Sequence, residues 1–308
     1  MSNSESRLVC TPLTKIVTSL EALAHSGCVF DHFKAIRDNS NVSWEVAQAI
    51  SEITGIPLSF PHEERSSEYG YPADFKPLSV EVQMDILNSI FPNLQLPKTE
   101  VLKSLDKMPL PKNSGSEGLL VFPKWQKIGA NHQLAAQKMV LTVFDHFNVL
   151  ADKIDLDFCR LERTEKNKLA YQYLVVNERF SFGDFYVIPA QFGISHRGRS
   201  IRRALEMIEF CPDLNFFEFG LGIFEIGAML LTHPTRIHLG SHGKNKDNLS
   251  MYCAGNVYDP KGNGKFHFVP WYLIDGYGNL SVGYRLNDGE CLGSVGTPSA
   301  FLPMPKQK

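Results

Sequence analysis

The chain has no long hydrophobic run and little net charge. Its longest apolar stretch, residues 221–231, contains Glu225 and is far shorter than the roughly 20 residues that span a bilayer. The formal net charge of -2 argues against a protein that coats nucleic acid non-specifically. The sequence therefore predicts no membrane segment, and any basic surface must be local.

The chain also lacks paired cysteines and a recognisable targeting pattern. Its six cysteines are scattered without a C-x-x-C pair, so neither a zinc ribbon nor a thioredoxin-like redox motif is indicated. The polar start MSNSESR does not fit a signal peptide. We therefore predict reduced thiols and a cytoplasmic protein.

What is present is enough chain, 308 residues, for two domains or for one domain with an extension. Apolar residues recur at helical spacing in the first part. The predicted helices lie at about 12–25, 30–37, 43–54 and 79–90. A stretch rich in proline and glycine then marks a boundary, so we predict an N-terminal helical region at 1–112 and a second domain at 118–308.

The second domain alternates short apolar runs with helical periodicity. Buried strands are expected at 118–122 and 185–188, each ended by a proline, and helices at about 131–151 and 221–232. Residues 168–177 fit either a helix or a strand, and that choice stays open. Successive strand–helix units predict an α/β or α+β fold, with a mixed, partly parallel sheet and flanking helices.

The end of the chain alternates turn residues with aromatic runs. The runs FHFVPWYLI and LSVGYRL predict strands or a hairpin that closes one edge of the sheet. The proline-rich sequence TPSAFLPMP is expected to lie as a strap on the surface.

The sharpest local feature is HRGRSIRR, residues 196–203, which concentrates positive charge at a predicted helix start. Unpaired backbone N–H groups and the helix dipole favour an anion there, and arginines donate in pairs to phosphate or carboxylate. The loop has neither the lysine nor the glycine spacing of a Walker A or dinucleotide-binding loop. The candidate ligand-binding residues in it are His196, Arg197, Arg199, Ser200 and Arg202, with Ser200 as the helix cap.

The alternative for this loop is a solvated helix start whose arginines pair with Glu206, Glu209 or other carboxylates. Two more candidates, Trp125 and Gln191, each stand two residues after a strand-ending proline. In a parallel sheet they would lie at the same edge as the basic loop and could stack on a ligand and hydrogen-bond to it. The alternative is that Trp125 packs against its own loop and that Gln191 hydrogen-bonds to nearby backbone.

Cys253 has two interpretations, and the expectation for Glu225 depends on whether its helix is buried. Cys253 is either a nucleophile activated by a histidine or a small core residue. The histidines near it in sequence are His233, His238, His242 and His267. His238 and His242 flank Gly240 in a predicted loop and so lack the helical face of a zincin-type pair, and we predict no metal site. Glu225, if its helix is buried, needs a partner, for which an arginine of the basic loop is the natural candidate.

Four segments resemble parts of uncharacterised bacterial proteins. They are FPKWQKIG, IPAQFGISHRGRSIRRA, EFGLGIFEIGAMLLTHP and YCAGNVY. The resemblance covers mainly residues 118–303, implies no activity and transfers no functional residue.

Together these features predict a protein that binds a phosphate-bearing or other anionic small ligand at the basic strand-end loop. They leave the reaction, if any, unassigned and call for no cofactor. The competing hypothesis is a non-catalytic interaction protein that docks an acidic protein or a nucleic-acid backbone on the same arginines.

Overall fold

The computed structural model describes most of the chain from residue 60 onward. The described residues are 60–67, 69–70, 75–111, 116–209, 215–236, 250–274, 279–287 and 290–304, with scattered single positions before 54. The chain divides into two compact units, Met1–Pro61 and His62–Lys308. The helices predicted before residue 55 lie outside the described residues, apart from single positions, so every element below belongs to the second unit.

The first sheet is antiparallel throughout. Its strands follow the order β1–β4–β11–β5, and β3 pairs with β4. Their bounds are β1 Gly118–Pro123, β3 Ser181–Phe182, β4 Phe185–Gln191, β5 Phe216–Gly220 and β11 Ser299–Pro303. Gly118 pairs with Ala190 and Pro123 with Phe185. The carboxyl ends of β1 and β4 therefore lie at opposite ends of the sheet.

Two predictions about this sheet are wrong. The sequence ends a strand at Ile188, whereas β4 continues through Pro189 to Gln191 and is buried along its whole length. The sequence also predicts a surface strap near the end of the chain. Instead, β11 is an inner strand between β4 and β5. Its prolines did not prevent strand formation because Pro298 precedes the strand, and Pro303 lies beyond the residues of β11 that pair with β4, so β11 is an edge there.

The second sheet contains the one parallel pair of strands found among the described residues, and Ile154 adds an isolated parallel bridge to Val282. Its order is β10–β6–β8–β7–β2, β9 pairs with β8, and only the β10–β6 pair is parallel. The bounds are β2 Leu161–Arg163, β6 Ser250–Tyr252, β7 Asn256–Tyr258, β8 Phe268–Ile274, β9 Leu280–Leu286 and β10 Val295–Gly296. Strands β8 and β9 are the predicted hairpin. The fold is therefore α+β, with mixed sheet pairing and flanking helices, as the sequence predicts.

Polar caps fix the starts of several helices. Asn131 accepts a hydrogen bond from the Leu134 N–H at 2.8 Å, and Thr164 one from the Asn167 N–H at 3.3 Å. The helices are α4 Val80–Ile90, α5 Lys98–Ser104, α6 Trp125–Ile128, α7 His132–His146, α8 Glu165–Val176, α9 Ile201–Glu209 and α10 Ile223–Thr232. Helix α8 settles the open choice at 168–177: residues 168–176 are helical, and Asn177 is the C-cap.

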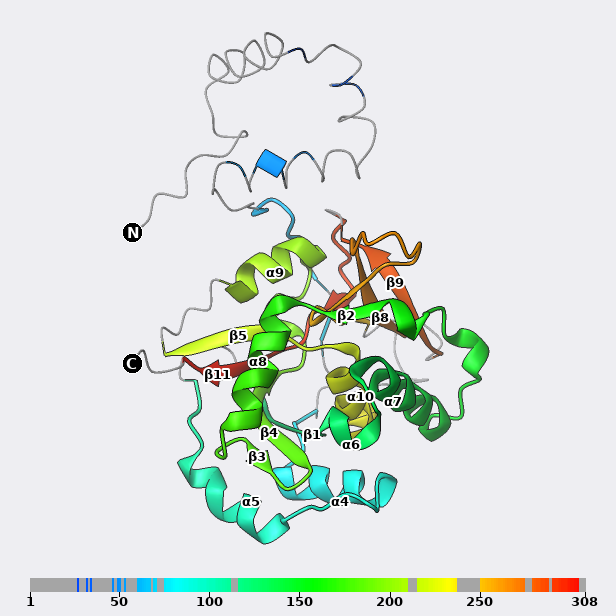
Figure 1. The fold of residues 1–308 in the computed structure, drawn as a ribbon. Helices are drawn as coiled ribbons and strands as arrows, with labels where there is room; N and C mark the ends of the chain where they lie inside the picture. Colours follow the sequence, from blue (N-terminus) through cyan, green and yellow to red (C-terminus); the bar gives the residue numbers. More distant parts are fainter. Residues whose placement is uncertain are drawn as a thin grey trace. The chain divides into compact units, whose positions relative to one another are not determined.

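Helix α10 is at the centre of the core, and every residue in it is buried. It contacts α7, α4, β1 and β8, so it bridges both sheets (Figure 1). A methyl group on Gly227 would lie 2.6 Å from Cγ of Met139 on α7, so glycine is what allows this close approach. Among the described residues, no helix has the length and apolar content needed to cross a bilayer.

Candidate functional site

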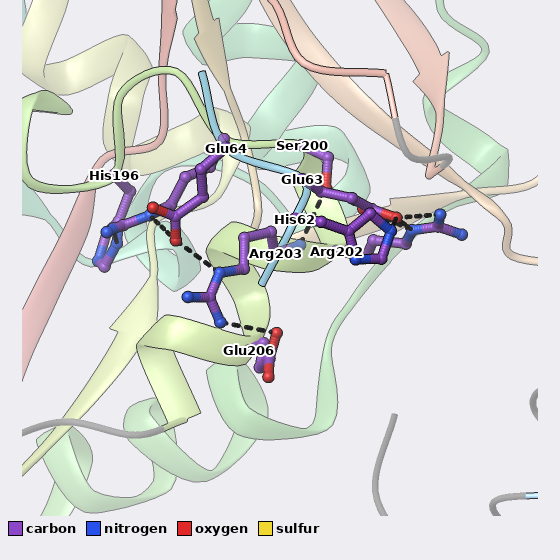
Figure 2. A network of polar contacts seen from close by, with 9 residues as sticks. His62, Glu63, Glu64, His196, Ser200, Arg202, Arg203 and Glu206 are labelled. Carbon is purple, nitrogen blue, oxygen red and sulfur yellow. Dashed lines mark hydrogen bonds and ion pairs between the residues drawn. The ribbon is translucent and has the colours of Figure 1, made fainter. Parts of the chain in front are cut away.

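Glu63 is the first of two carboxylates that pair with the arginines of the basic loop (Figure 2). Its oxygens accept the Arg202 Nε–H at 2.9 and 2.7 Å, and Oε2 also accepts the Ser200 hydroxyl at 2.6 Å. The same hydroxyl oxygen accepts the Arg203 N–H at 3.1 Å and so caps α9, as predicted. Glu63 is only 5% exposed, which makes it a buried partner of the helix start.

Glu64 holds two further arginines of the loop. Its Oε1 accepts the Arg199 Nε–H at 3.1 Å and the Arg203 Nε–H at 2.6 Å. Burial raises the pKa of Glu64, but hydrogen bonds and charge from Arg203 and Arg199 outweigh it and hold the pKa below its ordinary value. Arg203 also donates to Glu206 at 3.0 Å. Pairing with carboxylates, the alternative weighed for this loop, is therefore what the structure contains.

The chain around Glu63 and Glu64, which we call the acidic segment, is also held by its backbone. The Arg65 N–H donates to the Gly198 carbonyl at 2.9 Å, and the Ser200 N–H donates to the Glu63 carbonyl at 3.2 Å. Gly198 has a φ of 68°, and a Cβ there would lie 2.4 Å from the Arg65 oxygen. Glycine is therefore required where the two segments meet. Two adjacent glutamates in a chain with one arginine cluster were the sequence signal for this contact.

The remaining candidates near the loop are mostly interior. His196 is 5% exposed, with Nε2 2.6 Å from Oε1 of Glu218. Gln191 is fully buried and donates to the Thr297 carbonyl at 2.7 Å. Arg197 is exposed, and its Nη1 lies 3.4 Å from the Tyr69 carbonyl. An external anion would have to displace Glu63 and Glu64 before it reached the paired arginines.

Glu64→Gln is expected to weaken the fold at neutral pH by about 0.5–1 kcal/mol, the range of partly exposed ion pairs. Because the folded pKa of Glu64 is depressed, its contribution is present above the unfolded pKa and is lost as pH falls through the folded pKa. The wild-type protein should therefore lose more stability than the variant between about pH 5 and 3. Urea unfolding at several pH values measures this difference, with exposed Glu178→Gln as the control. Parallel wild-type and variant curves would contradict the pairing.

Trp125 lies away from the basic loop. Trp125 comes two residues after β1, and Gln191 is the last residue of β4. Because these strands are antiparallel, the two side chains lie at opposite ends of the sheet, and the structure does not bring them together. Trp125 instead lies beside Arg163, the last residue of β2. The Arg163 Cζ is 5.6 Å from the Trp125 ring centroid and 4.8 Å from that of Tyr171. Both distances are within cation–π range.

Near this guanidinium we define a group of polar side chains, the Arg163 cluster, in which Asn167 is included because it shares the buried side of α8 with Tyr171. Its members are Trp125, His132, Arg163, Asn167 and Tyr171. They come from α6, the first residue of α7, the end of β2 and α8. The rings of Trp125 and His132 are 6.1 Å apart. Trp125 and Arg163 are half-buried, whereas His132, Asn167 and Tyr171 are buried. The cluster is therefore reached from solvent on the Trp125 and Arg163 side.

Four buried atoms of the cluster have no hydrogen-bond partner within the described part of the chain. They are Nε1 of Trp125, Nε2 of His132, Nη1 of Arg163 and Oδ1 of Asn167. Buried polar atoms are almost always hydrogen-bonded, and leaving one unpaired costs about 1–3 kcal/mol. Four such atoms give the cluster unused capacity to hydrogen-bond a water molecule or a ligand.

Glu225 lies behind the cluster on α10. It is fully buried and accepts hydrogen bonds from the Tyr171 hydroxyl and, at 2.7 Å, from the Gly222 N–H. Burial raises the pKa of Glu225, while these hydrogen bonds and the charge of Arg163 act against it. The predicted partner, an arginine of the basic loop, is therefore wrong: a tyrosine holds the carboxyl group.

His132 is neutral at physiological pH. Burial, with the nearby charge of Arg163, lowers the pKa of this imidazole to about 3. Its Nε2 can therefore donate or accept, depending on the tautomer.

Cys253 is a core residue. It is fully buried, and burial raises the pKa of its thiol well above the ordinary value. Its sulfur lies 4.0 Å from the Met251 carbonyl oxygen. A buried neutral thiol is a poor nucleophile, which favours the core interpretation. His238 and His242 lie outside the described residues, and no group of three metal-binding side chains occurs in the part that the structure describes.

A cavity of about 440 Å³ lies between α4, α6 and α7. Its walls are largely apolar, and two lysines on them have partners: Lys127 pairs with Asp184 at 3.1 Å, and Lys138 donates to the Ile128 carbonyl at 2.9 Å. No member of the Arg163 cluster lines this cavity.

Comparisons with protein-family models, curated proteins and solved structures give no match. The resemblance to bacterial proteins stays a prediction, and function has to be inferred from the geometry of the site.

Proposed function

We propose that this α+β protein binds a small anionic ligand at the Arg163 cluster. One observation carries the proposal: a half-buried guanidinium has a buried Nη1 without a hydrogen-bond partner, beside the equally unpartnered Nε1 of Trp125. Both atoms are N–H donors, and one belongs to a permanent cation. A carboxylate or phosphate oxygen is the acceptor that suits such a pair best.

The choice between this cluster and the basic loop depends on what each site already holds. At the loop, Glu63 and Glu64 act as internal anions for Arg199, Arg202 and Arg203. At the cluster, no carboxylate within the described residues forms an ion pair with Arg163. A ligand at the cluster therefore displaces no carboxylate of the described residues. Anion binding at the loop, and docking of an acidic protein or nucleic-acid backbone there, stay predictions that require release of the acidic segment.

Thermal unfolding with added acetate, sulfate or inorganic phosphate tests the proposal. A ligand at 100 times its dissociation constant stabilises the folded state by about 2.7 kcal/mol, so at least one anion should raise the Tm of the wild-type protein. Arg163→Met should abolish that increase, because it removes both the charge and the donor. Trp125 fluorescence should change with the same anion.

Arg179→Met is the matched control, since this arginine is exposed on the same unit and the charge change is identical. It should retain the full anion-dependent increase in Tm. An increase in Tm that persists in Arg163→Met, or no increase with any anion, would contradict the proposal. Ordered water would then be the partner of these atoms.

A further inference from the structure

The charge of the Arg163 cluster limits the charge of its ligand. Arg163 is the cluster's cation, and His132 contributes none at neutral pH, since its pKa is about 3. Glu225 lies just behind: Tyr171 has the guanidinium over its ring and donates its hydroxyl to that carboxyl group. A second negative charge on the ligand would find no second cation in the cluster and would approach Glu225. The cluster therefore fits a monoanion.

The cluster also holds an acceptor that needs a donor. Asn167 is 1% exposed, and its Nδ2 donates to the Gly220 carbonyl at 3.2 Å. That bond fixes the orientation of the amide and leaves the buried Oδ1 without a partner. Asn167 precedes Tyr171 by one turn on the buried side of α8, and it follows Arg163 by four positions. Asn167 therefore lies on the same side of α8 as the tyrosine ring that carries the guanidinium.

A hydroxyl group supplies this donor better than an ammonium group does. Both can donate to Oδ1 of Asn167, but an ammonium group would bring a second positive charge next to Arg163, where like charges repel. The carboxyl group of Glu225, which could balance it, is already engaged by Tyr171 and Gly222. A neutral hydroxyl carries no such cost.

We propose, resting on the proposed function, that the ligand is a monocarboxylate with a hydroxyl group on the carbon next to the carboxylate. Its carboxylate oxygens accept from Nη1 of Arg163 and Nε1 of Trp125, and its hydroxyl group donates to Oδ1 of Asn167. These three atoms are buried and unpartnered in the described structure. One ligand of this class would give each of the three atoms a hydrogen-bond partner.

Calorimetric titration of the wild-type protein at pH 8 with matched acids tests this ligand class. The pairs are lactate with propionate, and 3-phenyllactate with 3-phenylpropionate, so that each pair differs in one hydroxyl group. Within the tighter-binding pair, the hydroxy acid is expected to bind at least about tenfold more tightly, because its analogue leaves Oδ1 of Asn167 unpaired. Inorganic phosphate, mainly a dianion at this pH, and alanine should bind more weakly than lactate.

The outcomes separate the two proposals. Equal affinity within both pairs, or tighter binding of phosphate or alanine, overturns the ligand class while Arg163-dependent binding of any anion keeps the proposed function. No binding of any probe overturns both. Asn167→Leu should reduce the affinity for the hydroxy acid to that for its analogue. If this variant does not fold, the wild-type series alone decides the matter.

Discussion

A chain that ends at residue 297 is expected to be unfolded. The truncation removes β11, in which Ala300, Phe301 and Leu302 have no exposed surface, and leaves β4 and β5 without the strand that joins them. Loss of one buried phenylalanine side chain alone costs about 3–5 kcal/mol. A whole domain is stable by only about 5–15 kcal/mol. Circular dichroism should show no cooperative thermal transition.

A shorter truncation provides the control. Removal of residues 305–308 leaves β11 complete, so the protein should unfold cooperatively at close to the wild-type temperature. Phe301→Ala should lie between the two, with a loss of about 3–5 kcal/mol. Cooperative unfolding of the chain that ends at 297 would mean that the first sheet does not depend on β11.

Tyr171→Phe is expected to lower the free energy of unfolding by about 1–3 kcal/mol at neutral pH, because it leaves a buried carboxyl acceptor without its hydroxyl donor. The change deletes only the hydroxyl group that donates to Glu225. Burial raises the folded pKa of Glu225, so the buried charge disfavours folding as pH rises through that value, and this penalty is absent below the unfolded pKa. The effect of Tyr171→Phe should therefore shrink in acid, where Glu225 is protonated.

Tyr173→Phe is the matched control on the same helix. Tyr173 is half-buried, and its ring packs against Phe180 and Phe217, contacts that phenylalanine preserves. Denaturant unfolding at pH 7 and pH 4 should show a loss below about 0.5 kcal/mol, without pH dependence. Equal losses for both variants would rule out a special contribution from the Tyr171 hydroxyl group.

Local chemistry made part of the fold predictable. Ser79, Asn131 and Ser200 cap helices where the sequence places them, since an N-cap depends on a side chain and the next three residues. The hairpin of β8 and β9 was predictable for the same reason, because neighbouring strands joined by a turn pair with each other.

Pairing between distant segments was not predictable in the same way. Strand β11 joins β4 and β5 through register, which no local pattern encodes, and its prolines resemble those of a loop. The contact of Glu63 and Glu64 with the arginines of the basic loop also depends on tertiary structure. Charge complementarity indicated that the arginines had partners and made the adjacent Glu63 and Glu64 candidates, but only the tertiary structure brings the two segments together.

The Arg163 cluster was only partly visible in the sequence. Trp125 was a candidate for a reason that the antiparallel sheet removes, and Arg163 and Asn167 were missed. The available signal was in residues 165–176: on a helix, Asn167 shares a face with Tyr171 and Leu174, which puts a polar residue in a buried stripe. The open choice between helix and strand concealed that pattern.

The position of β11 also has a consequence for how the protein folds. Ser299 of β11 meets Gln191 across 108 residues of chain. Until residues 299–303 arrive, the facing edges of β4 and β5 offer unpaired backbone groups to any neighbouring chain. Contacts of such long range also slow folding. We therefore expect the unpaired edges of the first sheet to promote aggregation of newly made protein, and a molecular chaperone to raise its yield.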